Sequence, residues 1–385
     1  MPNLGERRKK APAVDLKKFQ LHYVYDTMPG ISRKLMRQKF AYFHPTGKPV
    51  REKSILAHIR FLAIPPAWTD VWICPSANGH LQVTGRDAKG RKQYIYHAAF
   101  REMQDATKYE RLLAFAKILP RLRQQVEQDM ALPGLPKRRV AAAIVYLLEK
   151  TLIRIGNTDY AKQNNSYGIT TLRSPHVQLN GSDIRFKFTG KTGKIWKVQL
   201  KDRRVAKVIR ACEGLPGQQL FQYEDDQGQA QNINSTDVNE YLRDITGRDI
   251  TAKDFRTWAG TVLAAVKLND LHPVIGEAEA KRNIRAVINE VAARLGNTPA
   301  ICRSCYIHPA ILQLYTDGTL RLTIRNRSED NSLEAEERAV QALLHKVARR
   351  QPAEKTSPAQ SSLALAASLR ASIPLGKSST RESSV

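Results

Sequence analysis

The sequence predicts an α+β protein in which a small, mostly β domain precedes a larger, mainly helical domain that contains a short β-hairpin sheet. Three patterns in the 385 residues carry this prediction. Short apolar runs broken by turn residues extend to about Tyr96, and apolar residues at helical three- and four-residue spacings begin near Phe100. Between Asp183 and Leu200 the apolar period returns to two, which is typical of strands.

The first domain is expected to consist of short strands joined by tight turns. Apolar and polar residues alternate near Leu81–Thr84 and again over Gln93–Tyr96, and a basic turn that contains Gly90 lies between them. The prolines Pro65 and Pro66 interrupt any longer element. We therefore expect a small β-rich domain over residues 21–100, after a flexible basic arm over residues 1–20.

The second domain, over residues 101–325, is expected to be built on long helices. Tyr109–Met130 has one apolar face, and Arg139–Ile155 is apolar enough to be a central, buried helix. A hairpin turn is predicted at Gly190–Gly193. Thr251 is a suitable N-cap for the next helix, with Asp254 in the capping-box position.

The last elements follow the same logic. Glu277–Leu295 is predicted as a helix ended by Gly296, and Thr298 with Pro299 marks the start of another that carries Tyr306. Residues 326–385 are predicted to form a polar, partly disordered tail, with one amphipathic helix over Ser332–Arg349.

The charge balance indicates a polyanionic partner. The chain has 62 Lys and Arg against 36 Asp and Glu, a formal net charge of +26. The basic residues recur through both predicted domains, which favours a long nucleic-acid footprint over a membrane-docking patch. The sequence has no apolar run long enough to span a bilayer and no secretory signal at its start, so a cytoplasmic protein is expected.

The four cysteines predict reduced thiols. Cys302 and Cys305 have the spacing of a metal-ligand pair, but no second pair stands at zinc-finger distance, and His308 is the nearest further ligand. We expect no metal site and no disulfide framework.

Several polar residues could carry chemistry, but each alone has an ordinary explanation. Arg154 could pair with the carbonyls at its helix end, Lys191 could be a solvated turn lysine, and Arg256 could be a surface cation of an amphipathic helix. Tyr306 is one of 13 tyrosines and could be a packing residue.

Their order along the chain is more informative. Arg154, Lys191, Lys253-x-x-Arg256, Leu295-Gly296-Asn297 and Tyr306 together resemble the catalytic set of type IB DNA topoisomerases, of the compact bacterial and poxvirus-like kind. The stretches Ile64–Val71 and Gly85–Tyr96 resemble the N-terminal DNA-clamp domain of the same family. The resemblance covers about residues 21–319 and implies the catalytic fold that this family shares with tyrosine recombinases.

The resemblance implies a role for each residue. Tyr306 would attack the scissile phosphate and remain linked to the DNA 3′ end, Arg154 and Arg256 would hold the phosphate oxygens, and Lys191 would donate a proton to the 5′ oxygen. Asn297 stands where viral and eukaryotic relatives have histidine, so it would act as a hydrogen-bond donor only. The remaining expected DNA contacts are Lys89, Gln93, Tyr94 and Lys253.

The resemblance further implies a monomer that relaxes positive and negative supercoils of double-stranded DNA, without metal, nucleotide or other cofactor, at the nucleoid. Two alternatives remain open. A site-specific tyrosine recombinase uses the same chemistry, although it usually has His-x-x-Arg and Leu-Gly-His where this chain has Lys253-x-x-Arg256 and Leu295-Gly296-Asn297. An architectural DNA-binding protein without catalytic activity is the other.

Overall fold

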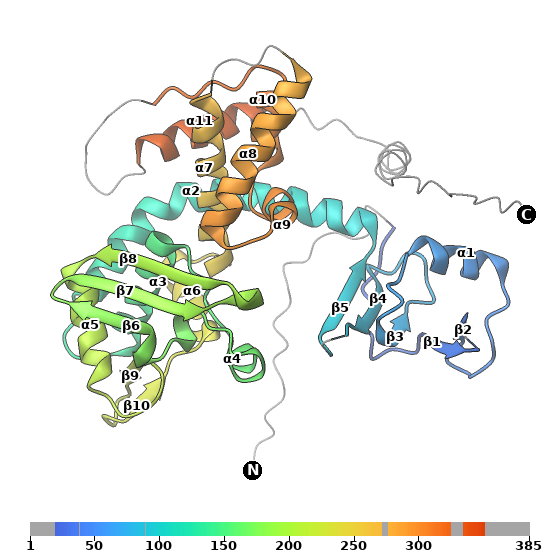
Figure 1. The fold of residues 1–385 in the computed structure, drawn as a ribbon, viewed down its shortest axis with the longest axis horizontal. Coiled ribbons are helices and arrows are strands. Elements are labelled where there is room, and N and C mark those ends of the chain that lie inside the picture. Colours follow the sequence, from blue (N-terminus) through green and yellow to red (C-terminus); the bar gives the residue numbers. More distant parts are fainter. Residues whose placement is uncertain (1–19, 38, 89, 272–275, 325–333, 351–385) are drawn as a thin grey trace, which may run out of the picture. The chain divides into compact units, whose positions relative to one another are not determined.

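The computed structural model describes residues 20–350 apart from 38, 89, 272–275 and 325–333 (Figure 1). These residues form two compact units that divide between Lys108 and Tyr109. Each unit has its own hydrophobic core, which confirms the α+β class of a small β-rich region and a larger helical one. Lys89 and residues 1–19 of the predicted arm lie outside the described residues, as do residues 326–333 and 351–385 of the predicted tail.

The first unit is a five-stranded antiparallel sheet in the order β2-β1-β3-β4-β5, with one helix packed against it. Ile59 of that helix and Ile31, Ile73 and Val83 of the sheet are fully buried together. The elements are β1 (Ile31–Met36), β2 (Lys39–Phe43), α1 (Lys53–Phe61), β3 (Thr69–Ile73), β4 (Leu81–Arg86) and β5 (Lys92–Tyr96).

The second unit is mainly helical and carries two small sheets of its own. A three-stranded antiparallel sheet has the order β6-β7-β8, and β9 pairs with β10. Its elements are α2 (Ala98–Met130, which begins before the division), α3 (Lys137–Thr151), α4 (Thr158–Asn164), β6 (Val177–Asn180), β7 (Asp183–Thr189), β8 (Ile195–Lys201), α5 (Arg203–Glu213), β9 (Gln222–Glu224), β10 (Ala230–Asn232), α6 (Ser235–Thr246), α7 (Ala252–Asn269), α8 (Glu277–Leu295), α9 (Pro299–Cys305), α10 (Pro309–Thr316) and α11 (Ala335–Arg350).

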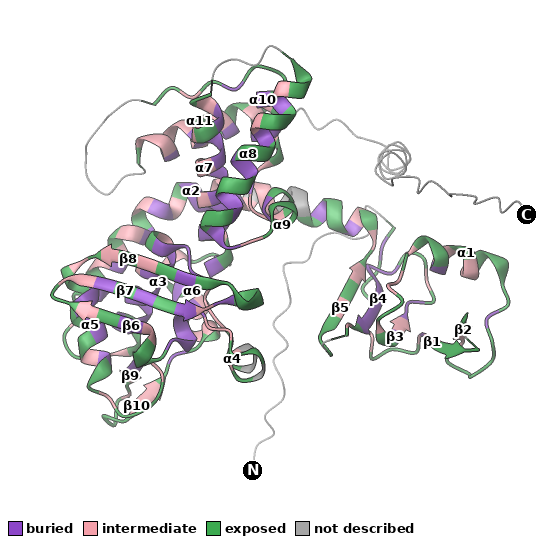
Figure 2. Ribbon diagram, viewed as in Figure 1, coloured by how far each residue is buried: buried purple, intermediate pink, exposed green. Residues whose placement is uncertain are grey.

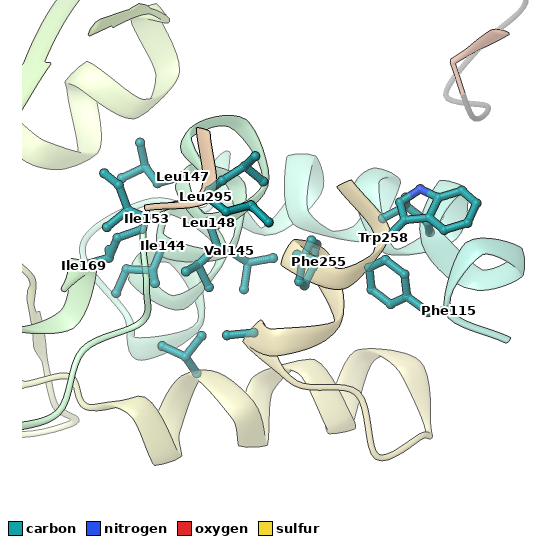
Figure 3. Packing of buried hydrophobic residues seen from close by; sticks show 14 of the residues in the cluster. Phe115, Ile144, Val145, Leu147, Leu148, Ile153, Ile169, Phe255, Trp258 and Leu295 are labelled. Carbon is teal, nitrogen blue, oxygen red and sulfur yellow. The ribbon is translucent and has the colours of Figure 1, made fainter. Parts of the chain in front are cut away.

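Helix α3 is the buried centre of this unit, as its apolar sequence predicts (Figure 2). Three consecutive alanines, Ala141–Ala143, let neighbouring elements approach closely, and Ile144 and Leu148 fill the remaining space. Figure 3 shows Leu148 beside Leu295 and Val145 towards Phe255, so the ends of α8 and α7 pack on α3. Burying each large aliphatic side chain here contributes about 1.5–3 kcal/mol.

Helix α3 ends four residues earlier than the sequence predicts. Leu152 adopts a left-handed conformation (φ 58°), and its amide donates to the Leu148 carbonyl, which closes the helix. A left-handed leucine is unusual because its Cβ crowds the following carbonyl. Glycine is the usual residue at such a position, and since this helix ends without one, the sequence does not mark its end. Arg154 therefore lies in an irregular segment after the helix and not on it.

Helix α11 is attached to the rest of the unit by a buried ion-pair network. The Glu337 carboxylate accepts hydrogen bonds from both terminal nitrogens of Arg123 (2.9 and 3.0 Å) and from the Trp258 indole (2.8 Å). Arg123 also pairs with Glu149 of α3.

Among the described helices, none has the long apolar stretch needed to cross a bilayer.

Candidate active site

Arg256 joins the ends of two helices. It lies on the buried face of α7, and its guanidinium donates to the carbonyl of Leu152 and to the carbonyl of Leu295 (2.6 Å for the latter). These carbonyls end α3 and α8, where no further helical amide is available to them, so a cation satisfies both. The side chain is only 4% exposed, and burial lowers its pKa. The alternative of a surface cation is therefore wrong.

Arg154 lies next to the same helix ends. One terminal nitrogen of its guanidinium donates to the Gly296 carbonyl (2.9 Å) and to the side-chain oxygen of Asn297. Its backbone is held by Gly168, where a Cβ would lie 2.5 Å from the Arg154 carbonyl oxygen. The Arg154 guanidinium therefore donates to a carbonyl at the end of α8 and not to the carbonyls at the end of α3, the helix that precedes it. Burial and the neighbouring charge of Arg256 lower the pKa of Arg154 to about 10.

Asn297 follows the glycine cap of α8. Gly296 is left-handed (φ 61°), and the Asn297 amide donates to the Ala292 carbonyl (2.9 Å), which is the hydrogen bond of a Schellman-type cap. Because the side-chain oxygen accepts from Arg154, the side-chain nitrogen is left as a donor. The cap thus fixes the position of an amide group beside two arginines.

Three buried donors at this point have no partner within the described part of the chain. They are the second terminal nitrogen of Arg154, the Nε of Arg256 and the side-chain nitrogen of Asn297. A buried donor that stays unpaired costs about 1–3 kcal/mol, and two of these belong to cations that repel one another. Such a group of donors matches the non-bridging oxygens of a phosphate diester.

Tyr306 stands beside these donors. It is the residue directly after α9, and its amide donates to the Cys302 carbonyl (3.0 Å). Its half-buried ring lies 5.3 Å from the guanidinium carbon of Arg256. The sequence predicted that the new helix would carry Tyr306, whereas α9 ends one residue earlier. The structure thus brings Arg154, Arg256, Asn297 and Tyr306 together from four separate segments.

The lysines are placed differently. Lys191 is exposed in the one-turn 3-10 helix (Lys191–Gly193) between β7 and β8, and its side-chain amine makes no hydrogen bond or ion pair with any described residue. The body of its hairpin is nevertheless attached to the site. The Trp196 ring packs so closely on Gly190 and on Gly296 that a Cβ at either would lie 2.6 or 2.5 Å from it. Lys253 is exposed one turn before Arg256.

Two of the DNA contacts expected in the first unit, Gln93 and Tyr94, lie on opposite faces of β5. Tyr94 is exposed and stacks on Tyr96, with ring centroids 6.1 Å apart. Gln93 points the other way, and its side-chain nitrogen donates to the Asp87 carboxylate (2.9 Å). Tyr94 is thus available to a ligand, whereas Gln93 would first have to leave Asp87.

Cys302 lies beside the site, since its carbonyl accepts from the Tyr306 amide. All four cysteines are free thiols, and burial raises the pKa of Cys302 to about 11. Among the described residues, no group of three or more His, Cys, Asp and Glu side chains could hold a metal ion.

Three residues that contact the site are not among those expected from the sequence. Trp196, Gly260 and Thr261 contact the site across long sequence separations. The only available signal was a glycine in the middle of an otherwise apolar helix at position 260.

Comparison with known proteins identifies the class. The family described as eukaryotic DNA topoisomerase I, catalytic core, matches residues 97–333, and the bacterial DNA topoisomerase IB N-terminal domain matches residues 39–87. DNA topoisomerase 1B of Acanthamoeba polyphaga mimivirus is 31% identical over 79% of this chain and 92% of its own. DNA topoisomerase I of monkeypox virus is 22% identical over 72% of this chain and 86% of its own.

A solved structure of the site-specific recombinase XerH bound to difH aligns with 58% of this chain and 56% of its own, at 13% identity and a TM-score of 0.31. The family match over residues 97–333 and the mimivirus relative show that the protein is a DNA-binding isomerase. More particularly, the chain belongs to the type IB DNA topoisomerase family, and its substrate is DNA.

Proposed function

We propose that Tyr306 is the nucleophile with which this topoisomerase cuts one DNA strand, and that Arg154, Arg256 and Asn297 bind the scissile phosphate. The observation that carries the proposal is a set of three buried donors beside the Tyr306 ring that have no partner among the described residues. Donors fixed before the reaction stabilise the charge that develops on the phosphate oxygens without reorganising.

The steps follow from this arrangement. The Tyr306 phenol gives its proton to solvent water, and its oxygen forms a bond to phosphorus while the bond from phosphorus to the 5′ oxygen breaks. The 5′ oxygen takes up a proton, for which Lys191 is the proposed donor, and leaves as a hydroxyl. The strand with the free 5′ end rotates about the intact strand, and the 5′ hydroxyl then attacks the phosphotyrosine to restore the DNA.

The proposal extends to the rest of the chain. Residues 21–100 serve as the DNA-clamp domain and residues 101–325 as the catalytic domain, with Lys89, Gln93, Tyr94 and Lys253 as DNA contacts. The enzyme acts as a monomer on chromosomal DNA in the cytoplasm. The energy for rotation is stored in the supercoils, so no ATP is needed, and Arg154 and Arg256 take the place that a metal ion has at the phosphate in many nucleases.

A relaxation assay tests this function. Wild-type protein should relax a supercoiled plasmid that carries no chosen recognition site, in EDTA and without ATP, and denaturant should trap protein-linked DNA. Tyr306→Phe should abolish both activities. Tyr315→Phe is the matched control, since its hydroxyl accepts a hydrogen bond from Asn283 away from the donor group. Activity only on paired recognition sites would favour a recombinase, and a fully active Tyr306→Phe would refute the role of Tyr306.

A further inference from the structure

The backbone that follows Tyr306 is fixed to α7 by one buried hydroxyl. The Thr261 Oγ1 donates to the Tyr306 carbonyl (3.4 Å) and accepts from the His308 amide (3.1 Å). Thr261 is 0% exposed, so water does not compete for these bonds. A single side chain therefore holds both sides of the short connection between α9 and α10.

Gly260 lets this connection approach the helix. A Cβ at this position would lie 2.7 Å from the Tyr306 carbonyl oxygen and 3.3 Å from the Tyr306 Cβ. Glycine inside a helix costs about 1 kcal/mol relative to alanine. The close approach of Tyr306 explains why glycine stands here in spite of that cost.

A third contact acts on the same connection. The Tyr109 hydroxyl donates to the Ile307 carbonyl (3.2 Å), and the Tyr109 ring lies against His308 with centroids 4.4 Å apart. Ile307 itself is completely buried. The residues after Tyr306 are thus held on several sides.

We propose that Thr261 and Gly260 are positioning residues that set the distance between the Tyr306 hydroxyl and the scissile phosphate. They stand four and five residues after Arg256 on one helix, so α7 carries both a phosphate-binding arginine and the anchor of the nucleophile. This inference rests on the proposed role of Tyr306. A shift of about 1 Å in a reacting group can cost 10²-fold in rate, so loss of the anchor should act on the cleavage step.

The experiment compares Thr261→Val with Thr257→Val. Valine keeps the shape of threonine and removes its hydroxyl. Thr257 is buried on the same helix, but its hydroxyl donates to the Lys253 carbonyl of that helix (3.1 Å) and to no other described residue. For each variant we would measure the single-turnover rate of denaturant-trapped protein–DNA adduct at saturating enzyme. The affinity for DNA, in the Tyr306→Phe background, and the melting temperature would be measured alongside.

We expect Thr261→Val to form the adduct at least about tenfold more slowly than Thr257→Val. The DNA affinities of the two variants should agree within about twofold, because only the placement of the nucleophile changes. Thr261→Ser, which keeps the hydroxyl, should restore most of the rate. Equal rates for the two valine variants, or no rescue by serine, would overturn the inference.

Gly260→Ala provides a second test that does not depend on the stability of the valine variants. Alanine favours the helix and removes no hydrogen bond, but it crowds Tyr306. A slower cleavage step in a protein that melts normally supports the inference, and an unchanged rate contradicts it. If wild type itself forms no adduct that depends on Tyr306, the proposed function is wrong, and the positioning role fails with it.

Discussion

The proposed site has two halves that are built in different ways: the group of Arg154, Arg256 and Asn297, which we name the arginine pocket, and the β7–β8 hairpin. Arg154 and Arg256 are held by carbonyls at the ends of α3 and α8, so folding itself puts them in place. Lys191 is exposed on a turn whose flanking residues are anchored, while its side-chain amine makes no hydrogen bond or ion pair with a described residue.

This difference suggests how the two halves work. We propose that the pocket is ready to receive a phosphate before DNA arrives, whereas Lys191 takes up its position only when the duplex lies against the hairpin. A pocket that is assembled before DNA binds lowers the stability of the free protein, as the donors without a described partner and the lowered pKa of Arg154 indicate. Mutations in the pocket should therefore affect stability and catalysis together, and mutations in the turn should affect catalysis alone.

The largest effect is expected for Arg256→Ala. Cleavage should slow by on the order of 10³-fold, since a preorganised donor to the phosphate is lost. Stability should fall by about 1–3 kcal/mol, since the carbonyls of Leu152 and Leu295 lose their donor. Single-turnover cleavage and thermal melting measure the two effects. A variant that is inactive but as stable as wild type would contradict the claim that the arginine pocket contributes to stability as well as to catalysis.

Lys191→Ala should slow cleavage by on the order of 10²-fold, because the departing 5′ oxygen loses its proton donor. Its melting temperature should stay that of wild type, as for most exposed substitutions. A substrate with sulfur in place of the 5′ bridging oxygen needs no proton, so it should restore the rate. Lys187→Ala, exposed on β7 of the same hairpin, is the control. No rescue by sulfur would exclude Lys191 as the proton donor.

Asn297→Ala should slow cleavage about tenfold, which corresponds to one hydrogen bond to a charged group. Asn297→His should regain part of this rate and make it depend on pH near 6.5, where imidazole titrates. The wild-type amide cannot titrate, so its contribution should not vary over that range. Rate profiles between about pH 5.5 and 7.5 make the comparison. If the cleavage rates of wild type and Asn297→His depend on pH in the same way, residue 297 does not contact the phosphate.

The smallest effect concerns the proton on Arg154. Its pKa is lowered to about 10 in the free protein, and a bound phosphate should raise it again. DNA binding should therefore take up protons near pH 10 and none from this group at pH 7, where it is protonated in both states. Calorimetry in buffers of different ionisation enthalpy measures the uptake, with Tyr306→Phe as the protein. The same background with Arg154→Gln should take up fewer protons, and equal uptake would contradict the prediction.

The order of residues in the sequence was sufficient to predict the members of the pocket, but not how it is built. Arg154 and Arg256 were expected to bind phosphate, yet nothing in the sequence shows that they also complete the ends of α3 and α8, because those contacts link residues more than 100 and about 40 positions apart. The early end of α3 depends on a left-handed leucine, which has no sequence signature.

Short elements were also missed. Strands β6, β9 and β10 have only three or four residues, too few for a periodic pattern to be recognised. The helices and hairpin with long, regular patterns were predicted well, including the turn that carries Lys191. The anchor at Thr261 could not be predicted, because a hydroxyl that bridges two backbone groups depends on the tertiary fold alone.

Hydrogen exchange of the Tyr306→Phe protein with and without duplex DNA tests the central claim most directly. The account predicts that the backbone amides around Leu152–Arg154 and Leu295–Asn297 are already well protected in the free protein and change little. The amides of Lys191 and Thr192, in contrast, should exchange fast in the free protein and become protected when DNA binds. Protection that rises in the pocket segments and not in the turn would contradict it.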